Sequence, residues 1–143
     1  MKRTLHLAML CLALLPVACS SSKGSSAYGE TEEKLQIDVT VTYLEKILLP
    51  PGSTVRAALY DESHELKPAI SSSAVTTREG RGMPAELEIS YPLDQIDDSH
   101  EYVIRAEITD PQGKLLFTTE EPVQVITDQE EPQKIDLVLK QVG

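Results

Sequence analysis

The sequence predicts an all-β domain, an antiparallel β-sandwich of about seven or eight short strands, in residues 34–143. Apolar and polar residues alternate over several short stretches, as they do in strands with one buried face. Turn-forming residues recur about every 8 to 14 positions, a spacing typical of sandwiches. No stretch of this segment shows the longer period of an amphipathic helix.

The first predicted strand has apolar residues at every second position: Leu35, Ile37, Val39, Val41 and Tyr43. Residues 54–61, TVRAALYD, repeat this alternation. Between the two, Pro50-Pro51-Gly52 cannot continue a ladder, so we expect a turn or crossover there. Residues 69–77, AISSSAVTT, form a weaker third strand, whose small polar residues suit the edge of a sheet.

The second half of the domain continues the pattern. Further strands are expected at 86–92, 101–110, 115–122, 123–127 and 134–142. Residues 93–100 form a loop with one helical turn. Asp110-Pro111-Gln112-Gly113 makes a turn, because proline presets φ and glycine supplies a positive φ. Phe117 is the only phenylalanine and tryptophan is absent, so aliphatic side chains must fill the core.

Residues 1–18 have the layout of a secretory signal peptide. Its parts are, in order, Lys2 and Arg3, the apolar residues 5–15, and the small residues Val17 and Ala18. The apolar run of about 11 residues is too short to span a bilayer stably. Cys11 leaves with the signal, so Cys19 would be the only cysteine of the mature chain.

The stretch Leu15-Pro16-Val17-Ala18-Cys19 resembles the lipobox of bacterial lipoproteins, with Pro16 where that family prefers leucine. The resemblance implies a lipid anchor on Cys19, and Ser20 implies the outer membrane, facing the periplasm. Residues 19–33 are rich in serine and glycine and would form a flexible lipidated tether. The alternative is a soluble secreted protein with an accidental cysteine.

The chain is strongly acidic, with a formal net charge of −10 at pH 7. This argues against binding nucleic acid, which requires basic groups to neutralise phosphate, and against lying on anionic lipid. Solubility is the ordinary reason for such acidity, and a basic partner is the alternative.

No catalytic constellation stands out. Residues 99–101, Ser-His-Glu, are the residue types of a triad, but neighbours on an extended chain point to opposite faces. Acylation of Cys19 would leave no thiol for catalysis or zinc. Asp94, Asp97 and Asp98 could offer oxygens to calcium, although their spacing matches no known calcium loop. We therefore predict a non-enzymatic protein without cofactor or metal.

The predicted edge strand is the candidate for protein contact, through Ile70, Ser72, Ala74 and Thr76. Small side chains at an edge would let another backbone approach and pair. The more ordinary interpretation is an edge that the serines and Pro68 protect from pairing.

Two stretches, KILLPPGSTVRAALYDES and ELEISYPLDQIDDSHEYVIRAEITDPQGKLLFTT, resemble a family of small bacterial lipoproteins. This family includes YbaY-type lipoproteins and the YscW-type pilotins of type III secretion. The matching positions are Leu49-Pro50-Pro51-Gly52, Tyr91-Pro92, Ile96-Asp97, Tyr102, Arg105-Ala106, Ile108 and residues 113–118. The resemblance implies a β-sandwich and, for the pilotin branch, a chaperone that binds a secretin subunit and brings it to the outer membrane.

We thus expect an outer-membrane lipoprotein that binds protein, with the type III secretion pilotin as the specific hypothesis. The alternative is a general YbaY-like envelope lipoprotein that binds another envelope component or a small ligand and has no role in secretion. An enzyme is a third hypothesis, suggested only by His100 and the acidic loop.

Overall fold

The computed structural model describes residues 33–63, 68–78, 82–126 and 133–143. The predicted signal peptide, Cys19 and the tether up to residue 32 lie outside these ranges. The strands are β1 (Lys34–Tyr43), β2 (Thr54–Asp61), β3 (Ser71–Thr76), β4 (Ala85–Pro92), β5 (Tyr102–Thr109), β6 (Leu115–Thr118), β7 (Val123–Val125) and β8 (Gln133–Gln141). None of the described segments forms a helix with the length and hydropathy needed to cross a bilayer.

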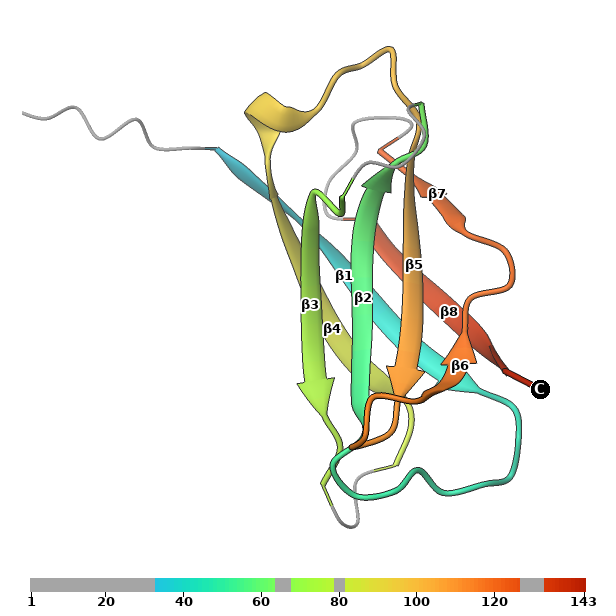
Figure 1. The fold of residues 1–143 in the computed structure, drawn as a ribbon. Helices are drawn as coiled ribbons and strands as arrows, with labels where there is room; N and C mark the ends of the chain where they lie inside the picture. The colour runs from blue at the N-terminus through green and yellow to red at the C-terminus, as the bar shows by residue number, and fades with distance from the viewer. Residues whose placement is uncertain (1–32, 64–67, 79–81, 127–132) are drawn as a thin grey trace, which may run out of the picture. The chain divides into compact units, whose positions relative to one another are not determined.

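The strands form one continuous sheet in the order β3-β2-β5-β6-β8-β1-β4, and β7 pairs with β5. Figure 1 shows β2, β3 and β5 in front of β1, β4 and β8, which run behind them at an angle. Strand β6 connects the two layers, because it pairs with β5 on one side and with β8 on the other. The sheet therefore curls until its end strands, β3 and β4, approach each other.

The all-β prediction is confirmed, but the arrangement differs from the predicted antiparallel sandwich in two respects. The β6–β8 pairing makes the sheet nearly closed, like a barrel, in place of two separate sheets. Strand β8 also runs parallel to β1, with Val39 opposite Ile135 and Tyr43 opposite Leu139. Neither feature follows from alternation, because alternation defines the buried face of a strand and not its neighbours.

The core consists of the inward residues of these strands. Its largest fully buried side chains are Tyr91, Phe117, Ile37, Leu59, Ile89, Ile104, Ile108, Leu137, Leu139, Val39, Val41 and Val55. The ring of Phe117 stacks on Tyr43, with centroids 4.4 Å apart. Apart from Tyr91 and Tyr102, the other buried core side chains are aliphatic, as the composition predicts. Burial of this apolar area provides most of the free energy that holds the layers together.

One chain segment forms both β6 and β7, and the two strands pair with different parts of β5, one after the other along its length. β6 pairs with the second half of β5 and β7 with the first half. Between them the Thr119 hydroxyl accepts a hydrogen bond from the Ala106 N–H at 2.7 Å and donates to the Ala106 carbonyl at 3.0 Å. Pro122, which has no N–H, follows this interruption and cannot extend the ladder.

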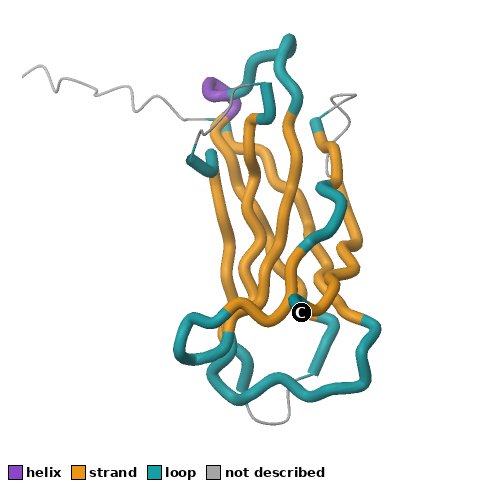
Figure 2. The backbone as a smooth tube through the Cα atoms, turned by 45° about the vertical axis from the view of Figure 1, so that its right-hand side comes forward, coloured by secondary structure: helices purple, strands orange, loops and turns teal. Residues whose placement is uncertain are grey.

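The loops gather at the two ends of the strands (Figure 2). At one end, a 3₁₀ turn, Leu93–Gln95, follows β4, as the sequence predicts. At the other end lies the loop of residues 44–53, between β1 and β2. In this loop Gly52 has a φ of +87°, and the buried Ser53 hydroxyl donates to the Pro50 carbonyl at 2.8 Å.

Candidate functional site

Strand β3, the predicted partner-binding strand, is an end strand of the sheet and pairs with β2. Three of the four predicted contact residues, Ser72, Ala74 and Thr76, are exposed on its outer face. Ile70 differs, because it precedes the strand, packs partly buried against the core and donates its N–H to the Leu59 carbonyl at 2.8 Å. These four residues therefore do not form one continuous exposed row.

The far side of β3 faces β4. The Ser71 hydroxyl donates to the Ser90 carbonyl at 2.5 Å, so a side chain bridges the gap between the end strands at that point. Towards the other end of β3 a hollow of about 490 Å³ opens, lined by residues that include Val75, Met83 and Pro84. An incoming strand would thus find β3 covered near Ser71 and accessible only towards Thr76.

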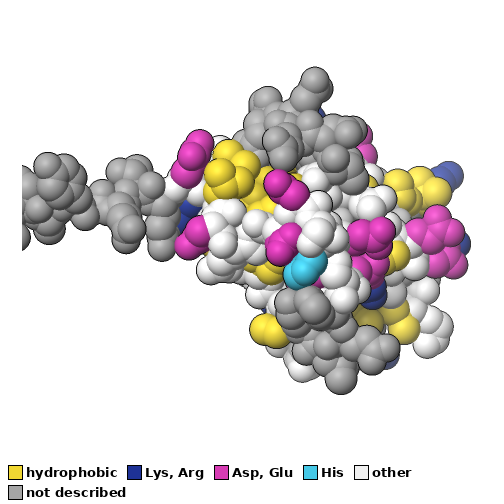
Figure 3. Space-filling model, turned by 90° about the horizontal axis from the view of Figure 1, so that it is seen from above, with side chains coloured by type: hydrophobic (Ala, Val, Ile, Leu, Met, Phe, Trp, Pro, Cys, Tyr) yellow, Lys and Arg dark blue, Asp and Glu magenta, His cyan; other side chains and the backbone are white. Residues whose placement is uncertain are grey.

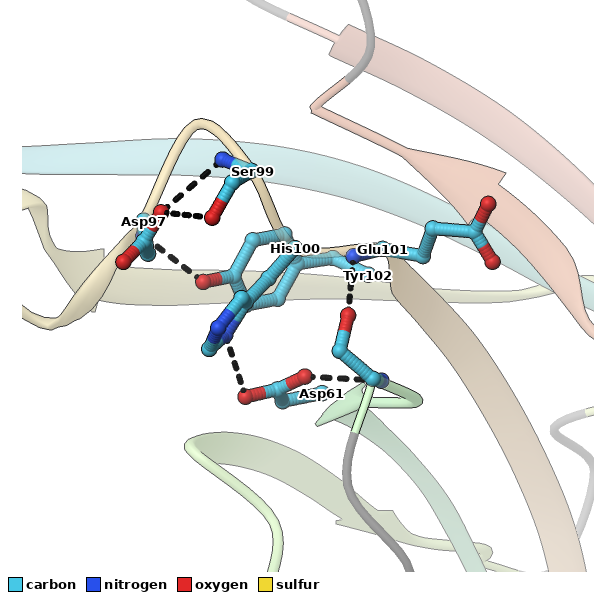
Figure 4. A network of polar contacts seen from close by, with 7 residues as sticks. Asp61, Asp97, Ser99, His100, Glu101 and Tyr102 are labelled. Atoms are coloured by element: carbon cyan, nitrogen blue, oxygen red, sulfur yellow. Dashed lines mark hydrogen bonds and ion pairs between the residues drawn. The ribbon is translucent and has the colours of Figure 1, made fainter.

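His100, the histidine on which the enzyme hypothesis is based, lies in a network of hydrogen bonds at the end of the domain that carries the 3₁₀ turn (Figure 4). The His100 Nδ1 atom is 2.9 Å from Asp61 Oδ2, and the Asp61 side chain is only 7% exposed. Asp61 Oδ1 accepts the Ser63 N–H at 2.9 Å, and the Ser63 hydroxyl accepts the Glu101 N–H at 2.7 Å. These contacts join the end of β2 to the start of β5.

Ser99 and His100 serve different carboxylates. The Ser99 hydroxyl donates to Asp97 Oδ1 at 2.6 Å, and its N–H donates to the same oxygen at 2.9 Å. These two donors lower the pKa of Asp97. The Tyr102 hydroxyl accepts the Asp97 N–H at 2.7 Å. The contacts organise the 93–101 loop and do not align Ser99 with His100 as nucleophile and base.

Acidic side chains gather around the cyan histidine when this end is viewed directly (Figure 3). Asp94, Asp97 and Asp98, the sequence-predicted calcium candidates, are all exposed. Within the described part of the chain, no three His, Cys, Asp or Glu side chains are grouped so that they could hold a metal ion. Cys19, the predicted lipidation site, lies outside the described residues.

The 44–53 loop carries an exposed apolar surface that the sequence did not predict. Leu44 is 80% exposed, Leu48 is 91% exposed, and Ile47 is also exposed. Leu49, in contrast, packs partly buried against the core. The corresponding signal in the sequence is the run of apolar residues in KILLPPG, which has no strand period and which a turn or crossover leaves unexplained.

Comparisons with known proteins give two matches. The model of a protein family described as type III secretion system lipoprotein chaperone (YscW) matches residues 32–139. A solved structure, described as an alternative pilotin from the type II secretion system of Vibrio cholerae, is similar with a TM-score of 0.69 and 33% sequence identity. The similarity covers 78% of this chain and 99% of that one. The comparison with curated proteins gave no match.

Proposed function

Because the chain belongs to the YscW family of type III secretion system lipoprotein chaperones, we propose that it is a pilotin. In this role it binds a secretin subunit in the periplasm and assists the subunit to reach the outer membrane and assemble there. The observation that carries the proposal is the family match over residues 32–139, which includes almost the whole β domain.

The proposed mechanism needs a binding domain and a lipid anchor on one chain. The β domain would hold the secretin subunit, and lipid on Cys19 would place the pair at the outer membrane. A buried methylene contributes about 0.8 kcal/mol of membrane affinity, so several acyl chains make release negligible. One anchor thereby converts binding of the secretin into its localisation, without catalysis.

The secretion system that the protein serves is part of the proposal. The family description names type III secretion, whereas the similar solved structure is a pilotin of type II secretion. We propose a type III secretin as the partner, in keeping with the family. A type II secretin is the rival partner, because the similar solved structure is a pilotin of that system.

The test is deletion of the protein in its own host, followed by measurement of secretin multimers in outer-membrane fractions. We expect the multimers of one secretin to fall and monomers to accumulate elsewhere in the envelope. Separate measurement of the type III and type II secretins identifies the system. Wild-type protein supplied in trans should restore the multimers, and the Cys19→Ser variant should not. Normal multimers after deletion would rule out the pilotin role.

A further inference from the structure

The exposed apolar residues of the 44–53 loop are held in place by the domain beneath them. The Tyr43 hydroxyl donates to the Ile47 carbonyl at 2.7 Å, and the Tyr43 ring stacks on the buried Phe117. At the far end of the loop, the Ser53 N–H and hydroxyl both bond the Pro50 carbonyl. A loop fixed in this way presents Leu44 and Leu48 to solvent with less backbone ordering cost at binding than a loop without these contacts.

The loop lies beside the end of β8 and beside β6. Tyr43 of β1 is opposite Leu139 of β8 in a parallel ladder, so the residues that follow the two strands are neighbours. The Val142 N–H bonds the Leu116 carbonyl, which brings the C-terminal end against β6. Val142 and Leu115 are themselves exposed apolar residues. The apolar surface therefore extends from the loop onto the adjoining strands.

The border of this surface carries more carboxylates than ammonium groups. Lys140 contacts Glu120, and its pKa is raised by Glu120 first and then by the charges of Glu121 and Glu45. The carboxylates of Glu45, Glu120 and Glu121 thus outnumber the ammonium groups of Lys140 and of Lys46 in the loop itself. The Glu45 Oε2 atom is buried and has no hydrogen-bond partner among the described residues. Because that atom is buried, a basic group of a partner would meet the exposed carboxylates of Glu120 and Glu121 instead.

We propose that the 44–53 loop docks an amphipathic helix of the partner, with Leu44, Ile47 and Leu48 against the apolar face of the helix and the exposed carboxylates of Glu120 and Glu121 near a Lys or Arg beside that face. This inference rests on the proposed function, because it identifies where the secretin subunit binds. β8 is paired with β1 and with β6 here, so it has no free edge for an added strand. A helix satisfies its own backbone and needs only side-chain contacts.

The position of the loop favours a protein over a bilayer as its occupant. Strand β1 begins at Lys34, and the loop follows the opposite end of this strand, about 30 Å away for a strand of this length. The neighbouring carboxylates would also repel an anionic lipid surface. An apolar surface bordered by acidic groups instead matches a helix with leucine-like and basic residues.

The first experiment uses the full-length protein in cells that make the proposed secretin, with a photo-crosslinking amino acid at position 48. As controls, the same amino acid is placed at position 72 on β3 and at position 93 at the opposite end of the domain. We expect crosslinks to the secretin from position 48 alone. Crosslinks from 72 or 93 but not from 48 would overturn the docking surface and leave the proposed function intact. Crosslinks from 48 to lipid or to a second copy of this chain would also overturn it.

The second experiment substitutes the surface. Leu44→Ser with Leu48→Ser, and separately Glu121→Lys, should lower the amount of secretin that copurifies by about tenfold or more. Leu93→Ser and Glu88→Lys are the matched controls and should change it little. Melting temperatures check that all variants fold, which the exposure of Leu44, Leu48 and Leu93 favours. If the loop variants copurify as much secretin as the wild-type protein does, the docking surface is refuted. If the wild-type protein itself copurifies no secretin, the proposed function is refuted.

Discussion

Phe117 lies on β6, the strand that joins the two layers of the sheet. It is fully buried on β6, lies opposite Ile108 of β5 and Gln141 of β8, and stacks on Tyr43 of β1. Its ring therefore contacts strands of both layers at the place where they join. Because Phe117 is the only phenylalanine in the chain, the sequence suggested that it lies in the core, but not that it lies where the two layers join.

We expect Phe117→Ala to lower the free energy of unfolding by about 3 to 5 kcal/mol, because it leaves a cavity between the layers. Chemical denaturation followed by circular dichroism measures the change. Leu93→Ala, at a side chain that is 41% exposed, is the control and should cost no more than about 0.5 kcal/mol. Equal stability of the Phe117→Ala variant and wild type would show that the ring is not part of the core.

Asp97 should make the 93–101 loop sensitive to acid. Hydrogen bonds from Ser99 lower its pKa, so the folded state favours the carboxylate. This stabilisation is fully present above the pKa of the unfolded chain, about 4, and is lost as pH falls through the lower folded pKa. An NMR titration of the Asp97 carboxyl carbon should show a midpoint below that of a free aspartate. Ser99→Ala should raise the midpoint, and an unchanged midpoint would contradict the contact.

At the scale of elements, turns at one end of the domain support one another. Gly52 and Gly113 both have positive φ values, +87° and +84°. A Cβ atom on Gly52 would come within 3.3 Å of the Pro111 ring, whereas a Cβ on Gly113 would meet open space. The loop after β1 and the turn after β5 are thus in close contact. The sequence predicted both turns from their proline and glycine residues, but not that they touch.

We therefore expect Gly113→Ala to cost about 1 to 2 kcal/mol of stability, the penalty of a left-handed conformation alone. Gly52→Ala should cost more, because the new methyl group also crowds Pro111. Thermal denaturation of the two variants side by side gives the comparison. If Gly52→Ala is the less destabilised of the two, the packing of these turns is not as described.

At the scale of the whole molecule, the proposed lipid on Cys19 determines where the binding domain works. We expect Cys19→Ser to move the protein from membrane fractions to the soluble periplasm, because no acyl chain can then be attached. The folded domain should keep its melting temperature, since the substitution lies before β1. Fractionation with immunodetection measures the distribution, and continued membrane association of the variant would show that the anchor is elsewhere.

The sequence alone determined the strands, their buried faces and the principal turns, because alternation, proline and glycine act within a few residues of the chain. It also supported the family, through motifs such as Leu49-Pro50-Pro51-Gly52. Only the tertiary structure decided that β8 runs parallel to β1, that β6 joins the layers, and that His100 meets Asp61. The exposure of Leu44 and Leu48 was likewise decided only by the tertiary structure. Such features depend on which distant segments pair, and local periodicity carries no information about that choice.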